Sequence, residues 1–313
     1  TPGTRWLAHV TQIAVRDLGT GIQRVVRSIL THWLRDPPDG VRIEPVAFRD
    51  GRYHHAHAYA CSLLGLAPPA DLPGDVVAIS GHETFVGLDW SVGSLPAAEP
   101  LLHTWRRAGV DMHFLVHDLL PVTLPDAFHP HTRMAFTAWL TTTVHLADGL
   151  VCVSKSTADE LERWLDTQAQ GQARRPYTST FPLGVDPPVP GGPGHLPPDL
   201  ENASAIRPTL LMVGTLEPRK GHAQALAAME RLWAEGEEAH LVIVGQRGWP
   251  VNELIDTLEG HKERGIRPFC FDHCDDGMLD AIYAASTALL APSPGEGFRL
   301  PVIDAAHLGT PAT

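Results

Sequence analysis

Residues 213–221 read Val-Gly-Thr-Leu-Glu-Pro-Arg-Lys-Gly, and they follow a short apolar run at 209–213 and precede a segment of helical periodicity. This order predicts a buried strand, a turn on two glycines and a helix that begins near Lys220. A helix N-terminus attracts anions, glycines let a ligand approach the backbone, and Arg219 and Lys220 add two cations. The turn therefore predicts a phosphate site, although a plain turn with two solvated cations has the same residues.

A second turn of the same kind spans residues 291–304, Ala-Pro-Ser-Pro-Gly-Glu-Gly-Phe-Arg-Leu-Pro-Val-Ile-Asp. It predicts a strand, a glycine-rich turn that contains Glu296, and a helix beginning near Pro301 with Asp304 about one turn inside it. Carboxylates accept hydrogen bonds from hydroxyls, so one can hold a sugar ring and the other a ribose, with phosphates on the turn amides between them. The alternative for Asp304 is a solvated position near the start of a helix.

The rest of the chain alternates strand and helix patterns, which is typical of βαβ units around a parallel sheet. In the second half we expect strands at 209–213, 240–244, 267–271 and 288–291, and helices at 220–235, 251–259, 276–285 and 300–308. In the first half we expect strands at 5–11, 41–48, 76–80, 111–117 and 149–153, and a helix at 22–34. Residues 309–313 resemble the turn into another strand, so we expect the second sheet to be incomplete.

Residues 187–208 are rich in proline and glycine, which cannot continue a helix or a central strand. They predict a linker between an N-terminal domain at 1–186 and a C-terminal domain at 209–313. Ligands of doubly wound sheets bind outside the carboxyl ends of the strands. We therefore expect the functional residues directly after strands, in a cleft between the two domains.

Composition and charge exclude several classes of protein. The chain is 43% hydrophobic and 19% charged, and its net charge of −12 opposes binding to nucleic acid. It has neither a signal-peptide pattern nor an apolar run of about 18 to 20 residues, and its four cysteines are too few for a disulfide framework, so we predict a cytoplasmic protein. Cys270, His273 and Cys274 lack a second ligand cluster at a known spacing, so we predict no metal site.

Together, the two turns resemble the C-terminal domain of family-4 retaining glycosyltransferases, which have the GT-B fold of two Rossmann-like domains facing a cleft. That family carries a Gly-Thr turn that ends in Arg-Lys-Gly and an acidic motif written Glu-Gly-Phe-Gly-Leu-Pro-x-x-Glu-Ala. The matching residues are Gly214, Thr215, Arg219, Lys220, Gly221, Glu296, Gly297, Phe298, Leu300, Pro301 and Ala305. Arg299 departs from the family's second glycine of the acidic motif, and Asp304 departs from its second glutamate.

This resemblance implies a role for each matching residue. Glu296 is expected to be a catalytic residue that orients the sugar hydroxyls, and Asp304 is expected to contact the ribose. The donor and its phosphates are expected to contact Gly214, Thr215, Arg219, Lys220, Gly297, Phe298, Arg299 and Leu300. The family has no agreed enzymic base, and it needs no cofactor beyond the nucleotide-diphosphate sugar that serves as donor.

Two segments of the first half carry resemblances of their own. Residues 17–27 contain the Gly-Ile-Gln-Arg-Val segment of bacterial O-antigen mannosyl- and rhamnosyltransferases, which implies that Gly19, Thr20 and Gly21 lie against the donor phosphates or the acceptor. Residues 114–126 resemble the family's Val-His-Asp-Leu-Ile-Pro stretch, which implies a catalytic His117 facing the donor sugar. A lone histidine at a strand end is also a common structural residue.

The resemblance implies a retaining, metal-independent hexosyltransferase that moves a sugar, preferably mannose from GDP-mannose, to a hydroxyl of a growing glycan. UDP- and dTDP-linked sugars stay open as donors. The acceptor can be lipid-linked, which would place the protein at the inner face of the membrane. A sugar-nucleotide 2-epimerase uses the same phosphate-binding architecture, and Arg299 and Asp304 also allow a non-catalytic module that binds nucleotide sugars or glycans.

Overall fold

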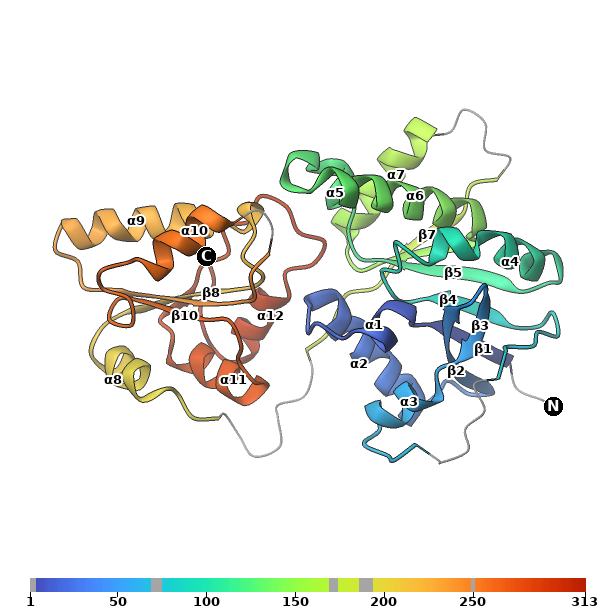
Figure 1. Ribbon diagram of the computed structural model, residues 1–313, viewed down its shortest axis with the longest axis horizontal. Helices are drawn as coiled ribbons and strands as arrows, with labels where there is room; N and C mark the ends of the chain where they lie inside the picture. Colours follow the sequence, from blue (N-terminus) through green and yellow to red (C-terminus); the bar gives the residue numbers. More distant parts are fainter. Residues whose placement is uncertain (1–3, 69–74, 169–173, 186–193, 249–250) are drawn as a thin grey trace. The chain divides into compact units, whose positions relative to one another are not determined.

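The computed structural model describes residues 4–68, 75–168, 174–185, 194–248 and 251–313 (Figure 1). The chain divides into two compact units. Unit 1 consists of residues 1–125 and 130–183, and unit 2 consists of residues 126–129 and 184–313. Each unit is an α/β unit with its own sheet.

Unit 1 is built on a seven-stranded sheet with the order β3-β2-β1-β4-β5-β6-β7. In the described part of the chain, β3 pairs antiparallel with β2, and the other neighbouring strands of this sheet pair in parallel. The strands are β1 Thr4–His9, β2 Val41–Arg49, β3 Arg52–His55, β4 Thr84–Gly87, β5 Asp111–Val116, β6 Gly149–Cys152 and β7 Tyr177–Thr180.

Helices cover both faces of this sheet (Figure 1). They are α1 Thr11–Val15, α2 Gly21–Arg35, α3 His57–Leu63, α4 Leu95–Arg107, α5 Leu120–Thr123, α6 Pro130–Leu146 and α7 Lys155–Gln168. Apolar residues of α4, α6 and α7 form one core with the sheet, among them Trp105 and Trp139. The helices α2 and α3 lie on the opposite face of the sheet (Figure 1). The buried apolar residues of α2 are Val25, Val26 and Leu30.

Unit 2 is built on a parallel sheet with the order β10-β9-β8-β11. Its strands are β8 Thr209–Val213, β9 His240–Val244, β10 Pro268–Phe271 and β11 Ala288–Leu289, and its helices are α8 Pro198–Ile206, α9 His222–Ala234, α10 Asn252–Glu259, α11 Asp276–Ala285 and α12 Leu300–His307. Successive residues of a strand face opposite sides of a sheet. Leu241 accordingly packs with α9 and α10, whereas Val242 packs with α8, α11 and α12.

Several predicted elements are confirmed residue for residue, namely β8, β9 and α11. The end of the chain also behaves as predicted, because Ala312 forms a parallel bridge with Leu289 of β11. Residues 311–313 therefore occupy a strand position beside β11. The sequence patterns missed the strands β3 and β7 and the helices α1, α3, α4, α5 and α6.

Two predictions were wrong. The strand expected at 76–80 is reduced to an isolated bridge between Val76 and His54, and the chain joins the sheet later, at β4. The linker expected at 187–208 contains the helix α8, because proline is tolerated at the first position of a helix and Pro198 stands there. Residues 187–193 of that linker lie outside the described residues.

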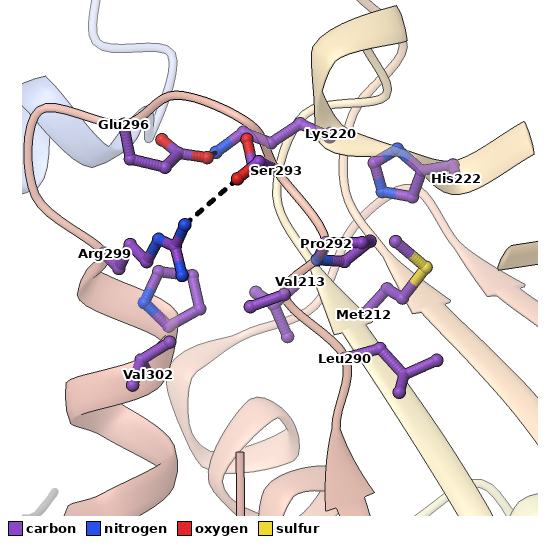
Figure 2. Close-up of a pocket in the computed structure, with 12 residues that line it drawn as sticks. Met212, Val213, Lys220, His222, Leu290, Pro292, Ser293, Glu296, Arg299 and Val302 are labelled. Atoms are coloured by element: carbon purple, nitrogen blue, oxygen red, sulfur yellow. Dashed lines mark hydrogen bonds and ion pairs between the residues drawn. The ribbon is translucent and has the colours of Figure 1, made fainter. Parts of the chain in front are cut away.

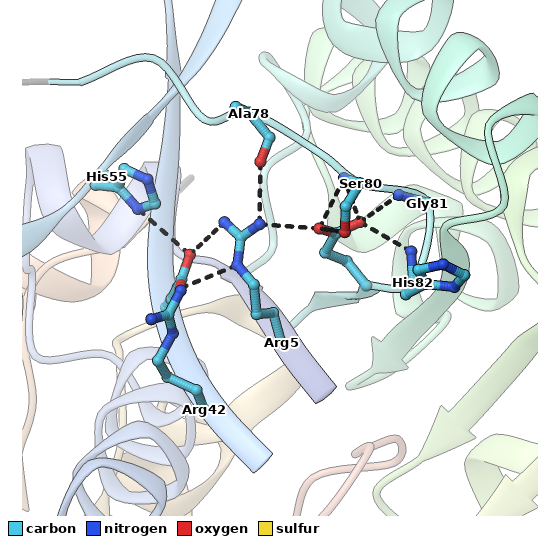
Figure 3. A network of polar contacts seen from close by, with 9 residues as sticks. Arg5, Arg42, His55, Ala78, Ser80, Gly81 and His82 are labelled. Atoms are coloured by element: carbon cyan, nitrogen blue, oxygen red, sulfur yellow. Dashed lines mark hydrogen bonds and ion pairs between the residues drawn. The ribbon is translucent and has the colours of Figure 1, made fainter. Parts of the chain in front are cut away.

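An ion-pair network ties together the amino ends of the central strands of unit 1 (Figure 3). The Arg5 guanidinium donates to both carboxylate oxygens of Glu44, at 3.1 and 2.7 Å, and to Glu83 Oε1 at 2.9 Å. Glu83 also accepts hydrogen bonds from the backbone amides of residues 80–82. These bonds fold the chain into a tight turn before β4, which explains why the strand begins later than its apolar pattern predicted.

Candidate functional site

The turn after β8 brings two cations to the carboxyl edge of the unit 2 sheet. Residues 218–220 form one turn of 3-10 helix, and Gly221 follows with a φ of 75°. A Cβ atom at Gly221 would lie 2.8 Å from Cγ of Pro292, so only glycine fits this turn without strain. The helix α9 begins at His222 rather than near Lys220 as predicted, because Gly221 ends the 3-10 turn.

Glu296 receives both cations of this turn. Lys220 Nζ lies 2.6 Å from Glu296 Oε1, and Arg219 Nη1 lies 3.2 Å from Glu296 Oε2. Figure 2 shows the Lys220 side chain extending toward the Glu296 carboxylate. The two turns that the sequence singled out thus meet, because β8 and β11 are neighbouring parallel strands whose carboxyl ends share one edge.

The electrostatics of this cluster keep Glu296 ionised. Burial acts to raise the pKa of the Glu296 carboxyl, but Lys220 and Arg219 act in the opposite direction, and the pKa lies below its ordinary value. A second carboxylate, that of Glu217, lies 2.8 Å from Arg219 Nε. The guanidinium of Arg219 is therefore held between two carboxylates.

Arg299 reaches the same cluster from the start of α12. Its Nη2 atom donates to the carbonyl oxygen of Ser293 at 3.0 Å (Figure 2). Ser293 is buried and its hydroxyl donates to the carbonyl oxygen of Arg219 at 3.0 Å, which joins the two turns. The backbone φ of Arg299 is −86°, so an arginine in place of the family's glycine introduces no backbone strain here.

The five charged side chains of the cluster leave one net positive charge, because Glu217 and Glu296 oppose Arg219, Lys220 and Arg299. The cavity beside them has a volume of about 30 Å³, which is room for about one or two water molecules. Lys220, Glu296 and Arg299 line it. The cluster therefore presents a small, weakly positive site at the edge of the sheet.

The sequence analysis missed one buried residue of this cavity, His222. It lies directly after the Arg-Lys-Gly turn and is 2% exposed. Burial, together with the charge of Lys220, lowers the pKa of His222 to about 4, so the imidazole is neutral at pH 7. The sequence feature that could have identified His222 is its position, because it is the first residue of a helix that follows a predicted phosphate-binding turn.

The other predicted residues of unit 2 lie close to the cluster but do not line its cavity. Gly214 lies beside Lys220, since a Cβ atom there would be 3.6 Å from Lys220 Cε. Asp304 is half-buried on α12. The remaining members, in the same two turns or at the start of α12, are Thr215, Gly297, Phe298 and Leu300.

The predicted glycine loop of unit 1 forms the entry to α2. Thr20 caps this helix in a capping box with Gln23. Gly19 has a φ of 65°, and its amide donates to Asp17 Oδ1 at 2.9 Å. Gly21 is the first residue of α2. The hydroxyl of Thr20 and the amide of Gly19 are thus already engaged in hydrogen bonds within the loop and at the start of α2.

His117 follows β5, as predicted, and is buried in unit 1. Its Nε2 atom lies 3.0 Å from the carbonyl oxygen of Leu88, which can only accept a hydrogen bond, so Nε2 carries the proton and Nδ1 is an acceptor. Burial lowers the pKa of His117 to about 4. The predicted residues fall into two groups, one in each unit.

A metal site and a membrane-spanning helix are both absent from the described residues. In that part of the chain, no three His, Cys, Asp or Glu side chains converge as a metal site would require. No helix there is both long and apolar enough to cross a bilayer.

Comparison with known proteins identifies relatives of both units. The model of the family described as glycosyl transferases group 1 matches residues 207–312. The chain is 36% identical over 312 residues to the serotype-specific mannosyltransferase WbdA of Escherichia coli, covering 97% of this chain and 37% of WbdA. It is 30% identical over 199 residues to the O-antigen chain mannosyltransferase B of Escherichia coli, covering 62% of this chain and 50% of that relative. The chain therefore spans half or less of the length of these two relatives.

Among solved structures, the chain resembles Anabaena HepE, determined in complex with UDP and glucose. The TM-score is 0.63 at 15% identity, and the match covers 99% of this chain and 80% of HepE. This likeness confirms the predicted GT-B fold. With the fold and the two meeting turns in place, residues 207–312 are a domain of the family described as glycosyl transferases group 1, within a chain that has the GT-B fold.

Proposed function

We propose that the chain forms part of a retaining glycosyltransferase that transfers mannose from GDP-mannose to a hydroxyl of a growing glycan of the O-antigen kind. The observation that carries the proposal is the convergence of Lys220 and Arg219 on Glu296. The two relatives named as mannosyltransferases support the choice of sugar. A lipid-linked acceptor at the inner face of the membrane stays a prediction.

In this proposal Arg219 and Lys220 bind the diphosphate of the donor. Positively charged groups aimed at a leaving group stabilise the charge that develops on it in the transition state. In the free protein Glu296 holds both cations in position, and Glu217 fixes the other side of the Arg219 guanidinium. An incoming diphosphate replaces Glu296 as their partner, which frees the carboxylate to accept hydrogen bonds from hydroxyls of the donor sugar.

We further propose that transfer needs no metal ion. Retaining transferases without an enzymic base use the leaving phosphate to accept the proton of the attacking hydroxyl, so the positive charge around that phosphate decides the rate. Arg219, Lys220 and Arg299 supply this charge. Asp304 is proposed to contact the ribose, and His117 is proposed to contact the donor sugar from unit 1.

The test is a transfer assay with radiolabelled GDP-mannose and mannotriose as acceptor, in the presence of EDTA. Lys220→Ala is expected to lower the transfer rate about 100-fold and to weaken GDP binding, because it removes a charged contact to the diphosphate. The matched control is Lys262→Ala, an exposed lysine of unit 2 outside the cluster. Transfer that is equal in the two variants would contradict the phosphate role of Lys220.

The same assay separates the proposed reaction from its alternatives. An α-linked product from the α-linked donor identifies retention. A donor whose sugar stays unchanged when mannotriose is omitted excludes epimerisation. GDP binding without transfer, in the wild-type chain and with several acceptor glycans, would instead favour a non-catalytic binding module.

A further inference from the structure

The cavity of unit 2 contains one polar side chain to which the proposed function gives no role, that of His222. This residue is the first of the helix α9, and its side chain lines the cavity together with those of Lys220 and Glu296 (Figure 2). Only 2% of His222 is exposed. Burying a polar ring costs free energy unless its polar atoms are hydrogen-bonded, so the partner of this imidazole indicates what the residue does.

The imidazole of His222 donates a hydrogen bond to the backbone carbonyl oxygen of Glu217. Its Nδ1 atom has no hydrogen-bond partner among the described residues, so Nε2 makes this bond and carries the proton of the neutral ring. Burial and the charge of Lys220 lower the pKa of the ring to about 4. At pH 7 the side chain therefore acts through this hydrogen bond and through packing, and not through charge.

Glu217 is the residue on which the turn of Arg219 and Lys220 depends. Its carbonyl oxygen also accepts a hydrogen bond from the amide of Lys220 at 3.0 Å, which closes the turn of 3-10 helix. Its carboxylate lies 2.8 Å from Arg219 Nε. A hydrogen bond from His222 to the Glu217 carbonyl therefore fixes the residue that contacts both cations of the turn.

This anchor matters because a single turn of 3-10 helix is held weakly by its own hydrogen bonds. Such bonds have poorer geometry than those of an α-helix, and the bond from the Gly221 amide to the Pro218 carbonyl oxygen is 3.2 Å long. The end of the turn is tied by Ser293, whose hydroxyl donates to the carbonyl oxygen of Arg219. His222 ties its beginning. Side chains from outside the turn thus hold it at both ends.

We propose that His222 is a positioning residue, which holds the turn of Arg219 and Lys220 in the geometry that binds the diphosphate of the donor. The inference rests on the proposed function, in which the diphosphate replaces Glu296 as the partner of the two cations. Once Glu296 no longer holds them, the backbone of the turn decides where the cations lie. A misplacement of about 1 Å in such a group can lower a rate about 100-fold.

The experiment compares two substitutions of His222 that differ in reach. Glutamine can place an amide N–H where Nε2 stands, whereas the shorter asparagine cannot reach the Glu217 carbonyl. Calorimetry with GDP at pH 7 is expected to show binding about tenfold weaker in His222→Asn and within about twofold of wild type in His222→Gln, because one hydrogen bond contributes roughly that factor. The matched control is His240→Asn, which replaces a histidine that is 3% exposed at the amino end of β9 and is expected to leave GDP binding unchanged.

A second measurement follows the turn itself in the absence of nucleotide. Amide hydrogen exchange in a peptide that covers residues 217–222, measured by mass spectrometry, is expected to be about tenfold faster in His222→Asn than in wild type and unchanged in His222→Gln. Both asparagine variants lose a buried imidazole of unit 2. A general loss of stability would therefore accelerate exchange throughout the unit in both variants, whereas loss of the anchor accelerates it at this turn in His222→Asn alone.

The outcomes separate this inference from the proposed function. Wild-type binding of GDP with equal affinities in His222→Asn and His240→Asn would overturn the positioning role and leave the donor site standing. Exchange at the turn that His222→Asn does not accelerate, or weakened binding that His222→Gln does not restore, would overturn it as well. No binding of GDP by the wild-type chain would contradict the proposed function and, with it, the diphosphate that the turn is proposed to bind.

Discussion

Glu296 illustrates how one carboxylate can hold two cations together. It lies between two cations that would otherwise repel each other at the edge of the sheet, with Lys220 Nζ at 2.6 Å and Arg219 Nη1 at 3.2 Å. The same two cations lower the pKa of Glu296, because they stabilise the ionised form of its carboxyl group. The arrangement keeps the cations in place when no phosphate is present.

The substitution Glu296→Gln tests this dual role. Glutamine keeps the size of the side chain but removes its charge, so the net charge of the cluster rises by one. We expect GDP to bind at least as tightly as in the wild-type chain, while transfer falls about 100-fold because the sugar loses a charged hydrogen-bond acceptor. Calorimetry with GDP and initial rates of transfer measure the two effects, with Glu253→Gln on the exposed face of α10 as control. Wild-type rates in Glu296→Gln would remove this residue from the reaction.

At the scale of elements, the apolar patterns predicted the strands β8 and β9 well, but they mispredicted where β4 begins and missed the helix α8. The strands β8 and β9 are continuous apolar runs buried on both faces, and such runs have few alternatives. The strand β4 is a four-residue element whose start depends on Glu83, a tertiary contact that no local pattern contains. The helix α8 was missed because its prolines were interpreted as breakers, although they stand where a helix tolerates them.

The same distinction holds for the site. The two turns were recognised from the sequence because the glycines and charged residues of each turn stand close together in the chain. Their meeting also follows from parallel strands that share an edge. The partners of each side chain did not follow from the sequence, because the hydrogen bond of Ser293 to Arg219 and the burial of His222 depend on packing between segments about 70 residues apart.

The turn before β4 gives a prediction for the stability of unit 1. Burial acts to raise the pKa of Glu83, but hydrogen bonds from Ser80, Gly81 and His82 lower it to about 2. A carboxylate with a depressed pKa stabilises the fold above its unfolded value near 4.5, and this contribution is lost as the pH falls toward 2. We expect Glu83→Gln to lower the free energy of unfolding by about 3 kcal/mol at pH 7, because it leaves three amides without a charged acceptor and leaves Arg5 with Glu44 as its remaining charged partner.

Urea unfolding of the wild-type chain and Glu83→Gln at pH 7 and pH 3 measures this contribution. The difference between the two proteins is expected to shrink at pH 3, because this pH lies below the unfolded pKa near 4.5 and the unfolded wild-type chain gains a proton that the folded chain does not bind. Asp159→Asn serves as control, because its ion pair with Lys155 is exposed on α7 and such pairs contribute about 0–1 kcal/mol. A difference between wild type and Glu83→Gln that is the same at both pH values would contradict the role of the charge.

For the whole molecule, both units bury neutral histidines at the carboxyl edge of a sheet. Burial lowers the pKa of His9 to about 3 and that of His117 to about 4 in unit 1, and burial with the charge of Lys220 lowers that of His222 to about 4 in unit 2. The folded chain therefore binds fewer protons than the unfolded chain between these values and the unfolded pKa near 6.5. Because the unfolded state gains those protons, stability is complete above pH 6.5 and declines as the pH falls toward 4.

This decline is expected to amount to about 1.4 kcal/mol per pH unit for each buried histidine. The two units need not unfold together, so the test uses a histidine of unit 2. The probe is the indole of Trp233, which is partly buried and packs against the core of that unit. Replacing His222 with asparagine is expected to flatten the pH dependence of the Trp233 transition between pH 6.5 and pH 4. His307→Asn, at an exposed position of α12, is expected to leave the slope unchanged. To keep the other tryptophans silent, both variants are made in a background in which Trp249 and the tryptophans of unit 1 are replaced by phenylalanine. An unchanged slope in His222→Asn would mean that His222 is already protonated in the folded protein, and the cavity beside Lys220 would then carry a further positive charge.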